Sequence, residues 1–196
     1  MTNLCIDLCC GLGGFSQAFS DDPTWEVIRI DISDKLGANI VADVRHLPLI
    51  EGLRPDVLLM SPPCTHFSLA RNRWPTKGIK DAMEIVGACL EAVATLKPRY
   101  WMLENPRGRL RWFIGKPYAT ISLGDYGSKI MKPTDLWGNV PLPIRASSGV
   151  RGIDANRKNL QRNLWPRDSS KRAELPRGLS IAIRESVEQA DLQDVK

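Results

Sequence analysis

The chain has 196 residues, 43% of them apolar, which suffices for one good core and leaves no room for a second large domain. A formal net charge of +5 favours a polyanionic partner, although a solvated basic face would give the same modest excess. Five cysteines without a CxxC pair, together with two histidines, indicate neither a disulfide framework nor a structural zinc site.

The N-terminal residues Met1 to Leu4 do not form a basic segment leading into an apolar one, and no apolar run reaches membrane-spanning length. We therefore expect an intracellular, cytoplasmic protein without a signal peptide, a membrane contact or a bound metal, and with reduced thiols.

A strand, a glycine turn and a helix are predicted in succession at the start of the chain. Asn3 to Leu8 reads as a short apolar strand, Gly11 to Gly14 follow almost directly, and a helix is expected from Phe15 to about Phe19. Glycines at such a turn let the backbone approach a ligand closely, and the helix start offers free N–H groups. Many α/β turns use glycine for conformation only, and the spacing here departs from GxGxxG.

Two acidic residues follow the next two predicted strands. Glu26 to Asp31 reads as a strand ending in Asp31, and Asn39 to Ala42 as a short strand followed by Asp43. An acid at such a position can accept hydrogen bonds from ribose hydroxyls. One acid would be unremarkable, but the glycine turn and both carboxylates together favour a nucleoside-type cofactor.

The stretch after the fourth predicted strand is the most informative one. Asp56 to Met60 reads as a buried strand, and Pro62 and Pro63 force the chain out of the sheet directly before Cys64. Because ligands bind beyond the carboxyl ends of strands in open α/β sheets, Cys64 is a candidate nucleophile. The alternative is a small buried thiol that serves packing only. Amino-methyltransferases place an aromatic residue at this position to stack the target base, which a thiol cannot do.

Further along, Arg71 to Lys77 is basic with an aromatic residue, so Arg71 and Arg73 could contact phosphate and a base, or belong to an ordinary exposed loop. The apolar spacing from Ile79 to Leu96 predicts a helix that buries one face and places Cys89 in the core.

Tyr100 to Leu103 is the next predicted strand, beside that of Cys64, and it ends at Glu104. Glu104 is either a plain exposed strand terminus or a partly buried acid whose pKa is raised, able to share a proton with a heterocyclic nitrogen.

The last third of the chain is less regular. A basic turn is expected around Arg107 to Arg111, a strand from Tyr118 to Leu123, and no element is assigned to Lys129 to Trp137. Residues 145–177 contain nine Lys or Arg and three Asp or Glu without apolar periodicity, as in a loop that binds a polyanion. Leu179 to Ala190 has the spacing of a helix packed on the sheet.

Three motifs are similar to those of a known family. Asp7 to Ser16, Ser61 to Ser68 and Glu104 to Pro106 resemble motifs of the DNA cytosine-5 methyltransferase family, in the same order and at compatible spacing. The resemblance covers most of the first 140 residues and implies an α/β, Rossmann-like fold, a mostly parallel sheet with helices on both faces. The expected division is a catalytic domain at 1–140, a short basic segment at 141–177 in place of the target-recognition region, and a C-terminal helix at 178–196.

The resemblance also implies S-adenosyl-L-methionine as the cofactor. Asp31 would hold its ribose hydroxyls, Asp43 its adenine amino group, and the glycine turn its methionine end. The full implied set of cofactor-binding residues is Asp7, Cys9, Cys10, Gly11, Leu12, Gly13, Gly14, Asp31, Ile32, Asp43, Val44 and Pro63.

For catalysis, the resemblance implies Cys64 as the nucleophile that adds to cytosine C6, and Glu104 as the residue that contacts the base at N3. Lys132 falls near the position of an arginine that holds the base carbonyl, without the planar fork of an arginine. The implied substrate-binding residues are Ser68, Asn105, Arg71 and Arg73.

DNA is the implied substrate, with its target base flipped out of the duplex, in a restriction-modification or phage context. Because the recognition region is so short, a protein partner that supplies target recognition is one hypothesis. Two alternatives stay open: a methyltransferase acting on RNA or a free pyrimidine nucleotide, and a catalytically inert relative that binds nucleic acid.

Overall fold

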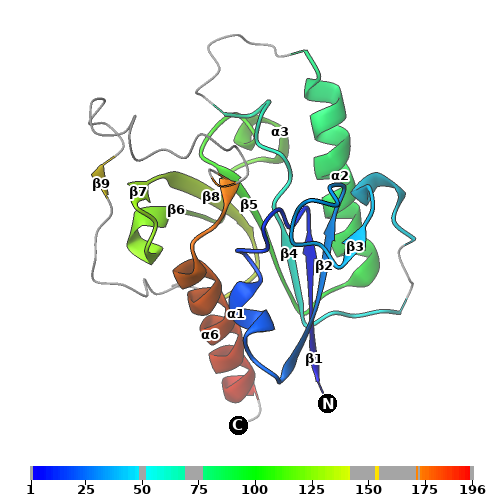
Figure 1. Ribbon diagram of the computed structural model, residues 1–196, viewed down its shortest axis with the longest axis vertical. Helices are drawn as coiled ribbons and strands as arrows, with labels where there is room; N and C mark the ends of the chain where they lie inside the picture. Colours follow the sequence, from blue (N-terminus) through cyan, green and yellow to red (C-terminus); the bar gives the residue numbers. More distant parts are fainter. Residues whose placement is uncertain are drawn as a thin grey trace.

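The computed structural model describes residues 2–48, 52–68, 77–141, 153–154, 171 and 173–194 (Figure 1). Its strands are β1 (Asn3–Leu8), β2 (Trp25–Asp31), β3 (Ile40–Val41), β4 (Val57–Met60), β5 (Tyr100–Pro106), β6 (Ala119–Ser122), β7 (Ile130–Met131), β8 (Pro133–Gly138) and β9 (Ile153–Asp154). Its helices are α1 (Gln17–Ser20), α2 (Ile79–Leu96), α3 (Arg111–Ile114) and α6 (Arg177–Asp194), with 3-10 turns at Val44–His46 and Leu123–Tyr126.

Seven of these strands form one mixed sheet in the order β3-β2-β1-β4-β5-β8-β6. β1, β2, β3, β4 and β5 pair in parallel, whereas β8 runs antiparallel to both β5 and β6. β7 and β9 form a separate parallel pair. The carboxyl ends of β1, β2, β4 and β5 therefore meet at one edge of the sheet, which we call the rim.

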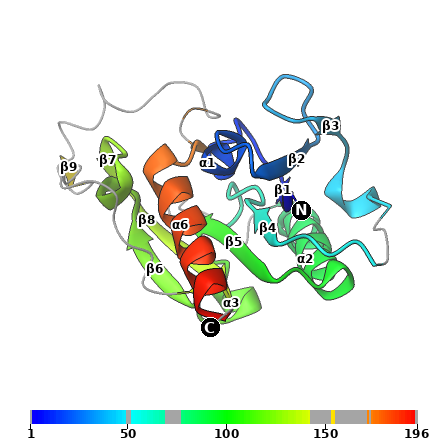
Figure 2. The same cartoon turned by 90° about the horizontal axis from the view of Figure 1, so that it is seen from below.

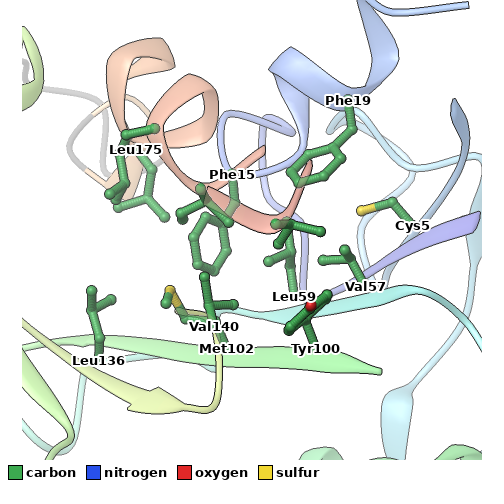
Figure 3. Close-up of a cluster of buried hydrophobic side chains, with 14 of the residues drawn as sticks. Cys5, Phe15, Phe19, Val57, Leu59, Tyr100, Met102, Leu136, Val140 and Leu175 are labelled. Carbon is green, nitrogen blue, oxygen red and sulfur yellow. The ribbon is translucent and has the colours of Figure 1, made fainter. Parts of the chain in front are cut away.

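Helices cover both faces of this sheet, as the sequence predicts (Figure 2). Strand β4 shows why: all its side chains are buried, with Val57 and Leu59 in one apolar cluster and Leu58 and Met60 in the other. Such a continuously apolar strand belongs at the centre of a sheet covered on both sides. The first cluster lies between the sheet and helices α1 and α6 and includes Phe15 and Phe19 (Figure 3).

Helix α2 covers the other face and has the bounds that its apolar spacing predicts. The centre of its buried face is formed by small and medium side chains, among them Ala82, Val86 and Cys89, while Met83 and Leu90 flank it half-buried. Small residues at the centre let the helix lie close to the sheet. Lys97 in a left-handed conformation, followed by Pro98, ends the helix.

Helix α6 packs back against the beginning of the chain. The Ser180 hydroxyl accepts from the Ala18 amide at 2.9 Å, and Arg184 pairs with Asp22 at 2.7 Å. Just before the helix, the chain passes so close to the glycine turn that a Cβ on Gly14 would lie 2.4 Å from the Leu175 carbonyl oxygen. The end of the chain thus forms one wall of that turn.

Three differences from the sequence-based expectations concern short elements. Phe15 lies in the turn, and helix α1 begins only at Gln17, because the glycine turn extends through Ser16. The basic stretch after β5 contains the short helix α3. Strand β7 and most of strand β8 fall in Lys129 to Trp137, where no element was assigned; β8 begins with a proline, which argues against a strand, although Thr134 to Trp137 are buried. The 1–140, 141–177 and 178–196 division stays a prediction.

Candidate active site

Cys64 lies on the rim, directly after the central strand β4. The Ser61 amide donates to the Leu8 carbonyl at 3.1 Å, so the chain leaves the sheet beside the end of β1. Pro62 is buried and Pro63 exposed, and the Cys64 carbonyl accepts from the amides of Phe67 and Ser68 at 3.0 Å each. A tight turn therefore fixes the backbone of Cys64, whose side chain is half-buried.

Glu104 lies on the neighbouring strand β5, as expected. Met60 and Leu103 are opposite each other in the β4–β5 register, so Cys64 and Glu104 follow the same level of the sheet. Glu104 is only 5% exposed, and its Oε1 accepts from the Thr134 hydroxyl at 3.1 Å. Burial raises the pKa of Glu104, against the opposing influence of Lys132 and of this hydrogen bond. The structure thus has the buried form of Glu104 and not an exposed strand terminus.

Lys132, between β7 and β8, is close enough to influence both groups. Burial raises the pKa of the Cys64 thiol, and the positive charge of Lys132 lowers it, while Glu104 raises it further. Lys132 likewise lowers the pKa of Glu104. A thiol, an acid and a cation from three separate segments therefore share one electrostatic environment at the rim.

The segment that follows β5 holds the Cys64 loop in place. The Asn105 side-chain amide donates to the Pro62 carbonyl at 2.9 Å. The backbone amide of Arg109 donates to the Phe67 carbonyl at 2.8 Å, and its guanidinium donates to the Ser68 carbonyl at 3.0 Å. A Cβ on Gly108 would lie 2.4 Å from the Phe67 carbonyl oxygen, so the two segments are in direct backbone contact.

The glycine turn occupies the other half of the rim. The Gly13 amide donates to the Cys10 carbonyl at 2.9 Å, and Cys9, Gly11 and Gly13 all have positive φ. A Cβ on Gly11 would meet no atom within 4 Å, so the backbone of the turn is open on that side. Leu12 contributes a carbonyl that packs against Gly37. The open backbone has the form of a ligand cradle.

The surroundings of the two cysteines in this turn favour the protonated thiol. A hydrogen bond with Cys89, together with burial, raises the pKa of Cys9, and burial raises the pKa of Cys10 to about 12. Cys9 thus contacts α2 in the core.

Asp7 lies beneath the turn, fully buried. Its Oδ2 accepts from the Ser16 hydroxyl at 2.6 Å, and the Arg29 Nε donates to the same hydroxyl oxygen at 2.8 Å. Burial raises the pKa of Asp7 to about 7, and Ser16 and Arg29 oppose the rise. Asp7 therefore reaches the glycine turn through Ser16.

Asp31 connects the turn to the end of β2. One carboxylate oxygen accepts from the Gly11 amide at 2.9 Å, and the other accepts from the Ser33 amide at 3.0 Å. The next residue, Ile32, is 68% exposed, although large apolar side chains are normally covered. An acid beside an uncovered apolar surface suits a nucleoside, which presents hydroxyls and a flat base.

Asp43 follows β3 and precedes the turn that begins at Val44. Its carboxylate accepts from the Arg45 amide and from the Arg45 guanidinium, each at 3.0 Å. These hydrogen bonds lower the pKa of Asp43 to about 2. Because β2 and β3 are parallel and Asp31 is opposite Val41, Asp43 and the half-buried Val44 lie beyond the same edge of the sheet at which Asp31 ends β2.

The predicted substrate-binding residues are partly visible. Ser68 and Asn105 lie in the interface that holds the Cys64 loop, and Arg71 and Arg73 lie outside the described residues. Two residues of the site were not predicted, Thr134 and Arg109. If Pro133 to Trp137 is read as a strand beside β5, Thr134 falls on the same face as Glu104. No sequence pattern predicts the position of Arg109, because it depends on a contact with the Cys64 loop, which is distant in the sequence.

Among the residues that the structure describes, no group of three His, Cys, Asp or Glu side chains could hold a metal ion. In the same part of the chain, no helix combines the length and the apolar composition of a membrane span.

Comparison with solved structures defines the fold as that of the α/β methyltransferases. A crystal structure from E. coli, described as a DNA modification methyltransferase encoded within a prophage, matches with a TM-score of 0.54 at 15% sequence identity. The match covers 78% of this chain and 53% of that chain, so this chain spans about half the length of that relative.

Comparison of sequences is more specific. Residues 4–111 match the C-5 cytosine-specific DNA methylase family, which is more than half of the chain. A Frog virus 3 (isolate Goorha) protein named "Probable DNA (cytosine-5)-methyltransferase" is 27% identical over 172 residues, which cover 77% of this chain and 79% of the relative. The chain belongs to the C-5 cytosine-specific DNA methylase family.

Proposed function

We propose that this protein transfers the methyl group of S-adenosyl-L-methionine to C5 of cytosine in DNA, through a covalent bond between Cys64 and C6. The observation that supports this most directly is the position of three residues at the rim: Cys64 follows β4, Glu104 lies on the neighbouring strand β5, and Lys132 directly precedes β8, which pairs with β5. A packing cysteine would need neither an acid nor a cation beside it.

Cys64 has the task of raising the reactivity of C5. Cytosine C5 is a poor nucleophile, and addition of a thiolate at C6 moves the C5–C6 electron pair onto C5. After C5 has taken the methyl group, a base removes the C5 proton, the electron pair of that C–H bond restores the C5–C6 double bond, and the C6–S bond breaks to release the thiolate. The nucleophile must therefore be a good leaving group also, which suits sulfur better than oxygen.

Glu104 has the task of stabilising charge. As the thiolate adds, negative charge develops in the ring, and a hydrogen-bonded proton at N3 counters it. Burial raises the pKa of Glu104, which favours its protonated form, and the Thr134 hydroxyl orients its Oε1. Burial thus favours the proton on Glu104, and the hydrogen bond from Thr134 fixes the orientation of its carboxyl group.

Lys132 has the task of favouring the thiolate. Burial raises the pKa of Cys64 and so favours the unreactive protonated form, and the nearby cation opposes this effect. We expect the same cation to contact the carbonyl of a base held against Glu104. Lys132 thus replaces part of what an arginine provides in the family.

The residues of the other half of the rim fit the cofactor. The open backbone at Gly11 suits the methionine part of the cofactor, and the carboxylate of Asp31 suits its ribose. The exposed side chain of Ile32 suits its adenine base. Asp43, Val44 and Pro63 would complete the contacts. S-adenosyl-L-methionine supplies an electrophilic methyl group when it is bound.

The test is transfer of label from tritiated S-adenosyl-L-methionine to unmethylated DNA, followed by digestion and identification of the labelled nucleoside. We expect label in 5-methylcytosine and a loss of at least about 10³-fold in Cys64→Ser. Cys5→Ala, a substitution within β1, is the matched control and should retain activity. Full activity of Cys64→Ser would contradict the mechanism.

A second candidate is supported by the short segment at 141–177, which limits the surface for reading a DNA sequence. RNA or a free pyrimidine nucleotide would then be the acceptor. The same assay with RNA and with nucleotides decides, since label in RNA or nucleotide without label in DNA would replace the first proposal. Label only after addition of a host-cell fraction would indicate a protein partner for recognition.

A further inference from the structure

The segment that joins β5 to β6 has an unusual surface. Trp112 is 64% exposed, Phe113 41% and Tyr118 39%, and these are the exposed aromatic side chains of the part of the chain that the structure describes. Every other aromatic side chain in that part is buried or half-buried. Exposed aromatic residues that gather in one short segment indicate a binding surface.

The charge of this segment points to a polyanion. Residues 106–124 contain Arg107, Arg109, Arg111 and Lys116 and no Asp or Glu. Arg111 is paired with Asp135, whereas Arg107 and Lys116 are exposed on either side of the aromatic residues. Helix α6 differs, since its 18 residues contain Arg177 and Arg184 against four acidic residues. The segment therefore carries a net positive charge, whereas helix α6 carries a net negative one.

The segment is also next to the catalytic loop. The ring of Phe113 lies 6.1 Å from that of Phe67, centroid to centroid, in an edge-to-face arrangement, and Phe67 is three residues after Cys64. Ser68 and Gly108 form a β-bridge. A strand of nucleic acid whose base is held at Cys64 would pass over this neighbourhood.

We propose that Trp112 and Phe113, flanked by Arg107 and Lys116, form a second contact surface for the DNA, on which a base near the methylated cytosine stacks. The proposal rests on the proposed function. Stacking on an aromatic ring tolerates any base, and the cations bind phosphates, so this contact adds affinity without reading a sequence. Such a surface suits a chain whose recognition region is short.

The test measures binding of a fluorescein-labelled duplex by anisotropy, in a Cys64→Ser background so that no turnover occurs. We expect Trp112→Ala to raise the Kd roughly tenfold and Trp112→Phe to restore most of the affinity. Arg107→Ala should reduce the slope of log K against log salt by about one. Cofactor affinity, measured by calorimetry, should remain unchanged in all three variants.

Leu192→Ala is the matched control, because Leu192 is 69% exposed near the end of α6, where Asp191 contacts the start of β5, far from the rim. Wild-type DNA affinity in Trp112→Ala would overturn the proposal, and so would equal losses in Leu192→Ala. If Trp112→Ala does not fold, an unaltered salt slope in Arg107→Ala overturns it instead. Stronger competition by single-stranded RNA than by the duplex would also overturn it. Because binding is measured without turnover, failure to methylate DNA is detected separately.

Discussion

The two halves of the rim shift the pKa of Asp43 and of Glu104 in opposite directions. On the half formed by β1, β2 and β3, Asp43 is surrounded by donors from Arg45, which lower its pKa to about 2. On the half formed by β4, β5 and β8, Glu104 is buried with one hydroxyl donor, and its pKa is raised. Hydrogen-bond donors favour the charged form of the carboxyl group on the first half, and burial favours its protonated form on the second.

This difference matches the chemistry of the two halves. A carboxylate that binds hydroxyl and amino groups must accept hydrogen bonds, and the ionised form offers the most acceptor sites. An acid that stabilises charge on a base must donate a proton, which requires the neutral form. Burial and the number of nearby donors decide between these forms, so substitutions that change either one test the comparison.

The largest effect is expected for Glu104→Gln. The amide has nearly the same shape and can donate a hydrogen bond to N3, but it cannot release a proton during the reaction. Turnover should fall by about 10²- to 10⁴-fold with cofactor affinity unchanged. Turnover by the tritium assay and cofactor affinity by calorimetry check this, with Glu84→Gln, on the exposed surface of α2, as the control. A Glu104→Gln enzyme as active as Glu84→Gln would show that Glu104 has no role in chemistry.

Lys132→Met should have the next largest effect, a loss of roughly 10²-fold in turnover. Because Lys132 lowers the pKa of Cys64, its removal should raise that pKa further. The rising limb of the activity–pH profile, and of the rate of thiol alkylation by iodoacetamide, should then move to higher pH. Lys132→Arg keeps the charge and should leave both limbs near their original position. If the pH profile of Lys132→Met is the same as that of the wild type, Lys132 does not lower the pKa of Cys64.

Asp31→Asn should weaken cofactor binding at the half of the rim formed by β1, β2 and β3, without changing the chemistry at the other half. The asparagine loses the charge with which Asp31 accepts from Gly11 and Ser33, and with which it would accept from ribose hydroxyls. Binding of S-adenosyl-L-methionine should weaken roughly tenfold, whereas turnover at saturating cofactor should change little. Calorimetry and the tritium assay separate the two quantities. An equal loss in both would mean that the halves are not independent.

The sequence predicts well which residues lie at the strand ends of the rim, because strand ends followed by Gly, Pro, Cys or acid are local patterns. The positions of Cys64, Glu104 and Asp31 in the fold follow from such patterns, whereas their roles stay predictions. The contact of Arg109 with the Cys64 loop, and the hydrogen bond from Thr134 to Glu104, depend on segments far apart in the chain. Strand β8 was missed because a proline begins it, and with it the position of Thr134. Likewise the bond between Asp43 and Arg45 requires a side-chain geometry that spacing alone does not fix.

Asp7 sharpens the comparison, although its replacement should affect activity least. It belongs to the cofactor half, yet its full burial raises its pKa to about 7, as burial raises that of Glu104. An acid whose pKa is higher in the folded state stabilises the fold below its ordinary pKa, near 4, and this stability is lost as pH rises toward 7. Thermal unfolding should therefore show a midpoint that falls over this range in the wild type and falls less in Asp7→Asn, which cannot ionise. If the unfolding midpoint falls equally with pH in both proteins, Ser16 and Arg29 keep Asp7 ionised in the folded state. Its charge would then be set by these two partners, as that of Asp43 is set by Arg45, and not by burial.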